Sequence, residues 1–332
     1  MCYFVAYMGT RSKTYLLTGA AGFIGSRFAE SCALRGIELL SVDLKSHFQS
    51  RTEHAQVLFG QTIDRDSLIS FLDKSAPKVD AIIHLGACTN TFELDADFFK
   101  RVNFEYTKAL WNFATQSGLP FVYASSGATY GAGELGYDDD EKLIPSLKPL
   151  NPYGQSKQDF DLWALNEEKN GNHPTSWAGF KFFNVYGFGE RHKSRMASVV
   201  LHSFDQIQKT GGVKLFRSHR TEISDGHQMR DFIAVEDVID VLHFAAGKPI
   251  NRGIFNLGSG RARTFLDLAR ATFAALKLPE KIEFVDTPEV LRERYQYFTE
   301  AKMQKLKLEG YTKPFRPLEE GVKIYVSRLI QS

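Results

Sequence analysis

Tyr153 and Lys157 are the residues whose types and spacing most clearly suggest chemistry. They stand four apart in a segment that Asn151-Pro152 opens as a helix, so both side chains would lie on one helical face. A nearby ammonium favours the phenolate and lowers the pKa of a tyrosine from about 10 towards the pH at which an enzyme works. Because a chain with 13 tyrosines has about one such spacing by chance, the pair needs support from its surroundings.

That support begins with the strand that precedes the pair. Residues 120–124 form an apolar run that we interpret as a strand, and it delivers Ser125 and Ser126 to a loop. A hydroxyl such as that of Ser126 could hold a substrate oxygen while Tyr153 takes its proton. A nicotinamide would take hydride from the same carbon.

A glycine-rich turn predicts where such a nucleotide would bind. Residues 18–25, TGAAGFIG, follow the apolar run 15–17 and lead into an amphipathic segment at 26–36. Gly19 allows a sharp turn, Gly22 lets backbone N–H groups approach a pyrophosphate, and Gly25 lets the helix pack closely on the strand. A second apolar run, 39–42, ends in Asp43, which is placed to bind an adenosine ribose.

The elements that must position these residues predict an α/β fold. Apolar strands are expected at 15–17, 39–42, 57–59, 80–85, 120–124 and 176–183, with helices at 26–36, 65–74 and 96–117 and another beginning at 152. Strands apolar on both faces and separated by helices indicate a Rossmann-type doubly wound parallel sheet. Ligands bind beyond the carboxyl ends of such strands, so Gly19, Asp43, Gly86 and Ser126 should share one rim.

Two loops and a second lobe complete the prediction. A polar loop carrying Lys45, His47 and Arg51 should follow Asp43, and the acidic run 138–141 is interpreted as part of a solvated loop. We expect residues 14–184 to form mainly the dinucleotide-binding domain. Residues 185–330 would be mainly a smaller α/β substrate lobe, some of whose elements return to the first domain. Helices are expected there at 196–209, 235–246, 264–276 and 299–309, and strands at 213–216 and 254–257.

Composition excludes several classes of partner. With 41 basic and 39 acidic residues among 332, no overall field favours nucleic acid or a membrane, and no apolar run approaches the ~20 residues of a spanning helix. The three cysteines, Cys2, Cys32 and Cys88, are too scattered for a disulfide framework or a zinc knuckle, so we expect no metal site and a cytoplasmic location. Residues 1–13 are interpreted as a frayed extension without the features of a signal peptide.

Together these motifs resemble the extended short-chain dehydrogenase/reductases that act on nucleotide sugars, and within them the ADP-L-glycero-D-manno-heptose 6-epimerases. The glycine turn, the Tyr-x-x-x-Lys pair, SSGATYG at 125–131 and NVYG at 184–187 carry the general likeness. The more specific blocks are His192-Lys193 followed by MASV at 196–199, GIFNLG at 253–258 with Arg261-Ala262, Arg294-Tyr295-Gln296 with Phe298-Thr299, and Gly310-Tyr311 with KPF at 313–315.

The resemblance implies inversion of a sugar carbon by transient oxidation. Hydride would leave the 6-position of ADP-D-glycero-D-manno-heptose to give a ketone, and its return to the other face would give the L-glycero epimer, a lipopolysaccharide core precursor. Inversion then needs proton handling on two sides, which the resemblance assigns to Tyr153 and Lys193. Partial burial would lower the pKa of Lys193 enough for its amine to accept a proton. Without the resemblance, the basic sequence of residues 191–193 more simply indicates a solvated loop.

The resemblance also implies a set of ligand contacts and assembly as a homo-oligomer, which in the family is a pentamer. The expected catalytic residues are Tyr153, Lys193, Lys157 and Ser126. The expected coenzyme contacts are Gly19, Gly22, Phe23, Ile24, Gly25, Asp43, Leu44, Arg65, Leu85, Gly86, Ala87, Cys88, Thr89, Asn103, Tyr153, Lys157, Val185 and Lys193. The expected contacts with the nucleotide sugar are Ser126, Asn184, Arg195, His202, Phe216, Arg230 and Tyr295.

The chain departs from the family pattern near the sugar. Phe188-Gly189-Glu190 stands where Pro-Arg-Glu is usual, Arg195 replaces a small residue, and 217–229 is longer than usual. These departures leave the exact nucleotide sugar open. The coenzyme is open too: Asp43 alone favours NAD, whereas the family prefers NADP with a basic residue nearby, for which Lys45, Arg51 and Arg65 are the candidates.

Three other functions were weighed. A UDP-hexose 4-epimerase type of enzyme can turn a flat ketone over with one tyrosine base and has no need of Lys193. A 4,6-dehydratase is disfavoured because Gly127-Ala128 occupies the place of its acid pair. The intact Ser126, Tyr153 and Lys157 argue against a non-catalytic dinucleotide-binding module.

Overall fold

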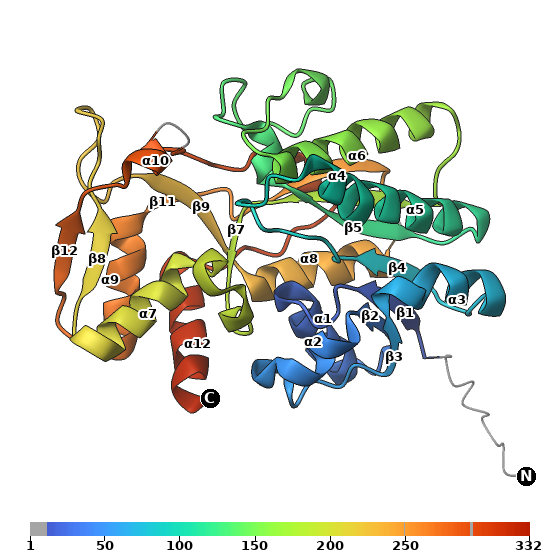
Figure 1. Cartoon of the computed structure of the whole chain (residues 1–332), viewed down its shortest axis with the longest axis horizontal. Helices are drawn as coiled ribbons and strands as arrows, with labels where there is room; N and C mark the ends of the chain where they lie inside the picture. The colour runs from blue at the N-terminus through green and yellow to red at the C-terminus, as the bar shows by residue number, and fades with distance from the viewer. Residues whose placement is uncertain (1–11, 249, 293–294) are drawn as a thin grey trace, which may run out of the picture.

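The computed structural model of the chain describes residues 12–248, 250–292 and 295–332. Its main sheet has seven strands in the order β10-β6-β5-β4-β1-β2-β3, all parallel (Figure 1). The strands are β1 (Thr14–Thr18), β2 (Glu38–Asp43), β3 (Gln61–Asp64), β4 (Ala81–His84), β5 (Phe121–Ser126), β6 (Trp177–Phe182) and β10 (Gly253–Leu257). The predicted Rossmann-type α/β sheet is confirmed.

Helices cover both faces of this sheet because its central strands are apolar on both. Leu17 of β1 faces one layer together with Phe28 of α1 (Phe23–Leu34), and α8 (Val235–Gly247) lies in the same layer. Leu16 faces the other layer with Trp111 of α5 (Tyr106–Gln116), beside α3 (Leu68–Ser75) and α6 (Pro152–Lys169). Adjacent residues of one strand therefore anchor opposite layers, as the two-residue period of a strand requires.

The strand order reverses between β1 and β4. β1 pairs with β2 on one side and β4 on the other, and the chain beyond each strand leaves at the same edge of the sheet. Such a switch point opens a crevice at the carboxyl ends of the strands, where ligands of doubly wound sheets bind.

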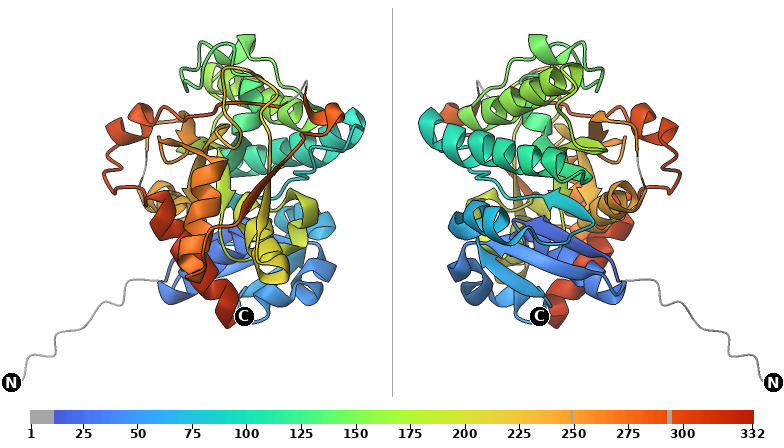
Figure 2. Two further views of the ribbon diagram at one scale, coloured as in Figure 1. Left: turned by 90° about the vertical axis from the view of Figure 1, so that its left-hand side faces the viewer. Right: turned by 90° about the vertical axis from the view of Figure 1, so that its right-hand side faces the viewer.

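The second lobe stands beside this edge (Figure 1), and it lies in front of the main sheet in the left view of Figure 2 and behind it in the right view. It contains a three-stranded sheet of β7 (Asn184–Tyr186), β9 (Met229–Ala234) and β11 (Ala262–Thr264), and a pair formed by β8 (Val213–Phe216) and β12 (Ile282–Val285). The helices α7 (Val199–Thr210), α9 (Phe265–Leu276) and α12 (Leu318–Gln331) pack together there. Between these elements the chain returns to the first domain, since β10 pairs with β6 and α8 contacts α1.

Short elements connect these parts. They are α2 (Lys45–Ser50), η1 (Thr52–His54), η2 (Arg65–Ser67), α4 (Ala96–Phe99), the π-helix η3 (Lys100–Glu105), η4 (Gly127–Tyr130), η5 (Ile144–Ser146), η6 (Arg191–Met196), α10 (Glu289–Arg292) and α11 (Gln304–Leu308). The predicted helix at 299–309 is thus confined to its second half. The predicted frayed extension lies almost wholly outside the described residues, as does Arg294 of one family signature. In the part of the chain described here, no helix combines the length and the apolar character needed to cross a membrane.

Two predictions between β2 and β3 are wrong. The polar loop after Asp43 is the helix α2, and the strand predicted at 57–59 lies later, at Gln61–Asp64. Val57 and Phe59 are apolar because they pack on the core from a loop, and the ring of Phe59 meets that of Phe48 edge-on at 5.0 Å. β3 is the edge strand and buries little, so its sequence lacks the apolar pattern of a strand.

The acidic run was also misinterpreted as a solvated segment. Asp139 is buried and accepts a hydrogen bond from the Asn256 backbone N–H at 2.8 Å, and Glu141 accepts one from Ile254 at 3.0 Å. Both donors belong to β10, the other edge of the main sheet. The carboxylates therefore occupy N–H groups that an open edge would leave free to pair with another strand.

Candidate active site

A pocket of about 860 Å³ lies at the carboxyl edge of the main sheet, within the size range of small-molecule sites. Its walls come from the turns after β1, β2, β4 and β5, from α6, and from η6 of the loop that follows β7. The predicted shared rim is present, because Gly19, Asp43, Gly86 and Ser126 all line this pocket.

The glycine turn after β1 has the geometry of a phosphate cradle. Gly19 has a φ of +67°, and a Cβ there would meet the Gly86 backbone N at 2.6 Å. A Cβ on Gly25 would come within 2.0 Å of the Gly19 carbonyl oxygen, and one on Gly22 within 2.9 Å of it. Any side chain would fill this cradle, so the residues present fit a pyrophosphate at the N-terminus of α1.

Asp43 is already held in place at the end of β2. Its carboxylate accepts hydrogen bonds from the Ala21 N–H at 3.0 Å and the Leu44 N–H at 2.8 Å, and it lies 2.7 Å from Nδ1 of His47. Arg51 donates to the Ala21 carbonyl and lines the pocket, as does Arg65, whereas Lys45 is not among the lining residues. The structure thus narrows the basic residues near the ribose position to Arg51 and Arg65.

Ser126, Tyr153 and Lys157 converge in the pocket from β5 and α6. The helix α6 begins there because Asn151 caps it, accepting from the Gly154 N–H at 2.8 Å, with Pro152 in the first turn. Burial raises the pKa of Tyr153, while hydrogen bonding with Ser126 lowers it in part. The net direction is opposite to the predicted one, because desolvation outweighs any stabilisation of the phenolate.

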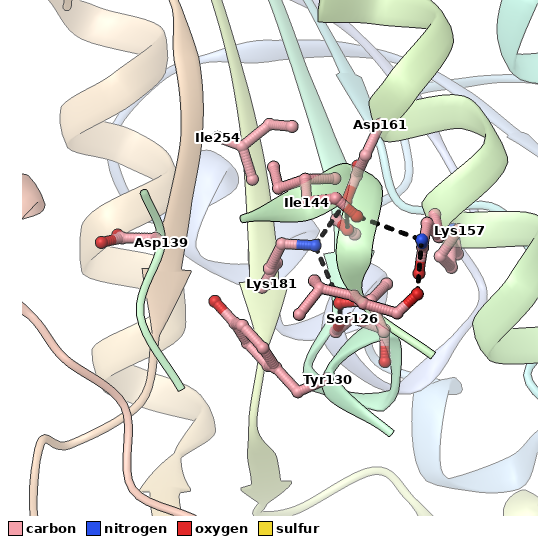
Figure 3. A network of polar contacts seen from close by, with 12 residues as sticks. Ser126, Tyr130, Asp139, Ile144, Lys157, Asp161, Lys181 and Ile254 are labelled. Atoms are coloured by element: carbon pink, nitrogen blue, oxygen red, sulfur yellow. Dashed lines mark hydrogen bonds and ion pairs between the residues drawn. The ribbon is translucent and has the colours of Figure 1, made fainter. Parts of the chain in front are cut away.

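Lys157 is buried and donates to the Ala124 carbonyl at 2.7 Å. Burial lowers its pKa to about 8, and the charge of Asp161 opposes this shift. Asp161, one turn further along α6, accepts from the Tyr123 hydroxyl at 2.8 Å and the Ser125 hydroxyl at 2.7 Å. Figure 3 shows this carboxylate between Lys157 and Lys181. The buried carboxylate of Asp161 therefore lies near the ammonium of Lys157 on the same helix, α6.

Lys193 reaches the same pocket from the opposite lobe. Its ammonium lies 5.5 Å from the ring centre of Phe23, and burial lowers its pKa, which Glu190 partly offsets. Glu190 is fully buried and ties the loop to α7, accepting from the Ser198 N–H at 2.7 Å and the Ser198 hydroxyl at 2.5 Å. Ser194, next to Lys193, has a φ of +50°, a region that favours glycine, so this loop stores backbone strain.

Comparison with known proteins identifies the family of this site. The sequence model of the NAD dependent epimerase/dehydratase family matches residues 15–258. The chain belongs to this family. The membership expected from the motifs is confirmed, and a nicotinamide dinucleotide is the coenzyme that the family description names.

Individual members of the epimerase/dehydratase family extend the match to the whole chain. A protein of Fusobacterium nucleatum named ADP-L-glycero-D-manno-heptose-6-epimerase is 45% identical over 326 residues, which cover 95% of this chain and 97% of the relative. The crystal structure of the Helicobacter pylori protein of that name has a TM-score of 0.81 at 26% identity, with 97% of each chain covered. A UDP-N-acetylglucosamine 4-epimerase from Methanobrevibacter ruminantium has a TM-score of 0.80 at 19% identity over 97% of this chain and 99% of that one, a likeness of fold alone.

Most residues predicted for coenzyme or substrate line the pocket of this family member. They are Gly19, Gly22, Phe23, Ile24, Gly25, Asp43, Arg65, Leu85, Gly86, Ala87, Cys88, Thr89, Ser126, Tyr153, Lys157, Asn184, Val185, Lys193 and Arg195. Leu44 and Asn103 do not line it. Asn103 exchanges hydrogen bonds with the backbone of Cys88 at 2.9 and 3.0 Å, so it supports the wall rather than forming it.

The four residues predicted for the nucleotide of the substrate lie outside the lining of this pocket. Arg230 of β9 is buried, and its guanidinium lies 5.5 Å from the ring centre of Tyr295. Phe216 ends β8 and is 38% exposed, while His202 lies on α7. All four belong to the second lobe, and Arg230 and Tyr295 contact each other there.

Sequence reasoning missed the residues that support this site from behind. Asp161 stands four residues after Lys157, so the helical spacing that paired Tyr153 with Lys157 could have extended to it. Lys181 and Glu190 gave no such signal, because a lone charge in an apolar strand or loop does not reveal its partner. Their roles depend on strands and helices that come together only in the folded chain.

Proposed function

We propose that this chain is an ADP-L-glycero-D-manno-heptose 6-epimerase, an isomerase that supplies a precursor of the lipopolysaccharide core. The observation that carries the proposal is the convergence of Tyr153 and Lys157 from one lobe and Lys193 from the other on a single pocket at the switch point. The relatives of that name, similar over nearly the whole chain, support it.

The coenzyme would sit along the rim of the sheet. The turn of Gly19, Gly22 and Gly25 would hold its pyrophosphate, and Asp43 and the strand ends at 85–89 would bind its adenosine end. When bound, the nicotinamide supplies a hydride acceptor and donor at the sugar carbon. Ser126 holds the oxygen on that carbon by a hydrogen bond.

Tyr153 and Lys193 divide the proton transfers between the two faces of the sugar. Burial keeps the phenol of Tyr153 protonated, which suits the donation of a proton to the ketone oxygen as hydride returns. Burial favours the neutral amine of Lys193, which can accept the hydroxyl proton as hydride leaves. Lys157 contributes its charge beside the phenol and anchors α6 to β5.

NADP is the coenzyme we propose, with NAD as the alternative. Asp43 opposes a 2′-phosphate, but the cations of Arg51 and Arg65 line the same end of the pocket. A guanidinium can pair with two phosphate oxygens at once. This pairing offsets the repulsion by Asp43.

The second lobe, mainly residues 185–330, would bind the ADP part of the substrate. Arg230 suits a diphosphate, and Tyr295 and Phe216 offer rings to an adenine. We further propose that the enzyme works in the cytoplasm, because its three scattered cysteines fit a reducing compartment. We also propose that it is a homo-oligomer, as its resemblance to the heptose epimerases implies.

A panel of nucleotide sugars tests the function. The purified chain is offered ADP-D-glycero-D-manno-heptose, UDP-glucose and UDP-N-acetylglucosamine, and epimer formation is followed by NMR. We expect inversion of the heptose at C6 alone. Inversion of a UDP-hexose at C4 would replace the proposal with a 4-epimerase, and bound coenzyme without turnover of any sugar would indicate a non-catalytic module.

A further inference from the structure

Three side chains with metal-binding atoms meet where the loop that carries Lys193 contacts the first domain, and one of them, His192, also lines the active-site pocket. Glu53 and His54 come from η1, and His192 comes from η6. One ligand-type atom from each lies within 4.8 Å of the other two. The rings of His54 and His192 meet edge-on, with their centres 5.6 Å apart. The group therefore joins the first domain to the loop after β7.

Each of these side chains has a buried polar atom that the described part of the chain leaves without a hydrogen-bond partner. The atoms are Oε1 of Glu53 and the Nδ1 atoms of His54 and His192. A buried polar atom without a partner costs about 1–3 kcal/mol. Three such atoms in one cluster indicate that something absent from the protein itself satisfies them together.

The other atoms of the group are occupied, which sets the direction of the free lone pairs. Nε2 of His54 lies 3.3 Å from the Gly189 carbonyl oxygen and 3.1 Å from the Ser26 hydroxyl. Because a carbonyl only accepts, we assign the proton to Nε2, and Nδ1 of a neutral ring then keeps its lone pair for a ligand. Oε2 of Glu53 accepts from the Arg191 N–H at 2.9 Å, which leaves Oε1 for another partner. His54 is only 2% exposed, so bulk water does not reach this lone pair freely.

We propose that Glu53, His54 and His192 bind a divalent transition-metal ion of the Zn²⁺ type. Two imidazoles and one carboxylate are an established zinc ligand set, with a fourth position left for water. The second partners of the ligands, Gly189 and Arg191, orient His54 and Glu53 as metal ligands usually require. The sequence predicted no metal site because its cysteines are scattered, and the spacing of Glu53, His54 and His192 matches no zinc motif that would have indicated one.

Positive charges around the site limit its affinity for a divalent metal ion. Arg27, Arg51 and Lys193 stand nearby. Burial and these positive charges together lower the pKa of both imidazoles and keep them unprotonated. The same cations repel a dication, so we expect micromolar rather than tighter binding. Ligand atoms around a tetrahedral Zn²⁺ lie roughly 3.3 Å apart, so the ion must draw the three side chains together.

Metal binding would fasten the loop of Lys193 to the first domain. His192 is the neighbour of Lys193, and Ser194 beyond it holds a strained backbone conformation. An ion shared between η1 and η6 would reduce the motion of this loop. The proposal does not depend on which nucleotide sugar the pocket accepts.

The test is calorimetric titration of ZnCl₂ into the full, untagged chain after dialysis against a chelator, with its nicotinamide coenzyme bound. We expect one equivalent to bind, and we expect Glu53→Gln and His192→Ala each to weaken binding at least tenfold. His227→Ala is the matched control, because the ring of this exposed histidine hydrogen-bonds the Asp225 carbonyl and belongs to another loop, and the variant should bind as the natural chain does. Hydrogen exchange should slow at residues 188–198 when Zn²⁺ is added, in the natural chain and not in His192→Ala.

Two results would overturn the proposal. One is no binding at micromolar Zn²⁺, and the other is binding that is equal in the natural chain, Glu53→Gln and His192→Ala. Circular dichroism confirms that each variant is folded. The absorption spectrum of the Co²⁺-loaded chain provides a second measurement. A thiolate charge-transfer band would show that the ion binds a cysteine and would contradict the proposed ligands. Bands from d–d transitions without a thiolate band would support them.

Discussion

The ammonium of Lys181 lies 2.6 Å from a carboxylate oxygen of Asp161, and neither side chain is exposed (Figure 3). Lys181 also donates to the Thr129 hydroxyl at 2.8 Å, and Asp161 accepts from two further hydroxyls. Both charges are thus satisfied where β5, β6 and α6 meet, directly behind Lys157. This pair connects the stability of the sheet with the electrostatics of the pocket.

Removing one partner of this pair should destabilise the fold strongly. Lys181→Met removes the direct ion-pair partner of the buried Asp161 carboxylate, which typically costs about 3–5 kcal/mol of unfolding free energy. The measurement is urea unfolding at pH 7. Lys214→Met is the control, since Lys214 pairs with Glu283 at 3.6 Å on the surface and should cost less than about 1 kcal/mol. Equal losses would mean that burial does not strengthen the Lys181–Asp161 pair.

Lys157 should make stability depend on pH in the alkaline range. Its pKa is about 8 in the folded chain and about 10.4 when unfolded, so the unfolded state binds the proton more strongly. The free energy of unfolding therefore rises as pH passes from about 8 to about 10. Between pH 7 and 9.5 we expect the natural chain to gain about 2 kcal/mol relative to Lys157→Met, measured by urea unfolding. An unchanged difference would show that burial does not depress this pKa.

Tyr153→Phe should lose epimerisation by at least about a hundredfold, because the phenol donates the proton to the reacting oxygen as hydride returns. Coenzyme binding, measured by fluorescence titration, should remain within about threefold of the natural chain, since the phenol is one contact among many. Tyr311→Phe controls for the loss of a hydroxyl. The Tyr311 hydroxyl is buried and has no hydrogen-bond partner among the described residues, so its removal should leave activity intact.

Lys193→Met should likewise reduce inversion at C6 by at least about a hundredfold. Lys193→Arg should not rescue it, because a guanidinium keeps the charge but cannot accept a proton. Inversion is followed by NMR with ADP-D-glycero-D-manno-heptose. Full activity in either variant would remove Lys193 as a base and leave Tyr153 to act alone.

Arg51→Gln should weaken NADP binding about tenfold, the worth of one charge-assisted contact with the 2′-phosphate. NAD binding should change by less than about twofold, because NAD lacks that phosphate. Isothermal titration with both coenzymes makes the comparison. Lys45→Gln is the matched control, since Lys45 is basic and near in sequence but does not line the pocket. Parallel losses for NAD and NADP would exclude a phosphate contact.

Local patterns predicted the parts of the fold that depend on neighbours in sequence. The glycine turn, the strand ends and the cap of α6 follow from steric and hydrogen-bonding needs that residues close in the chain satisfy for one another. The prediction failed at Val57, Phe59 and the acidic run, where apolar or charged residues have partners far along the chain. An edge strand such as β3 escaped notice because it buries few side chains.

Periodicity and short spacings were sufficient to predict the α/β alternation, the place of the coenzyme turn after β1 and the helical face shared by Tyr153 and Lys157. Which side chains meet became evident only in the folded chain: Lys193 reaches the pocket, Lys181 pairs with Asp161, and His54 packs against His192. The tertiary structure also decided the direction of the Tyr153 pKa. Desolvation depends on everything that packs around a group, and most of those neighbours come from distant parts of the chain.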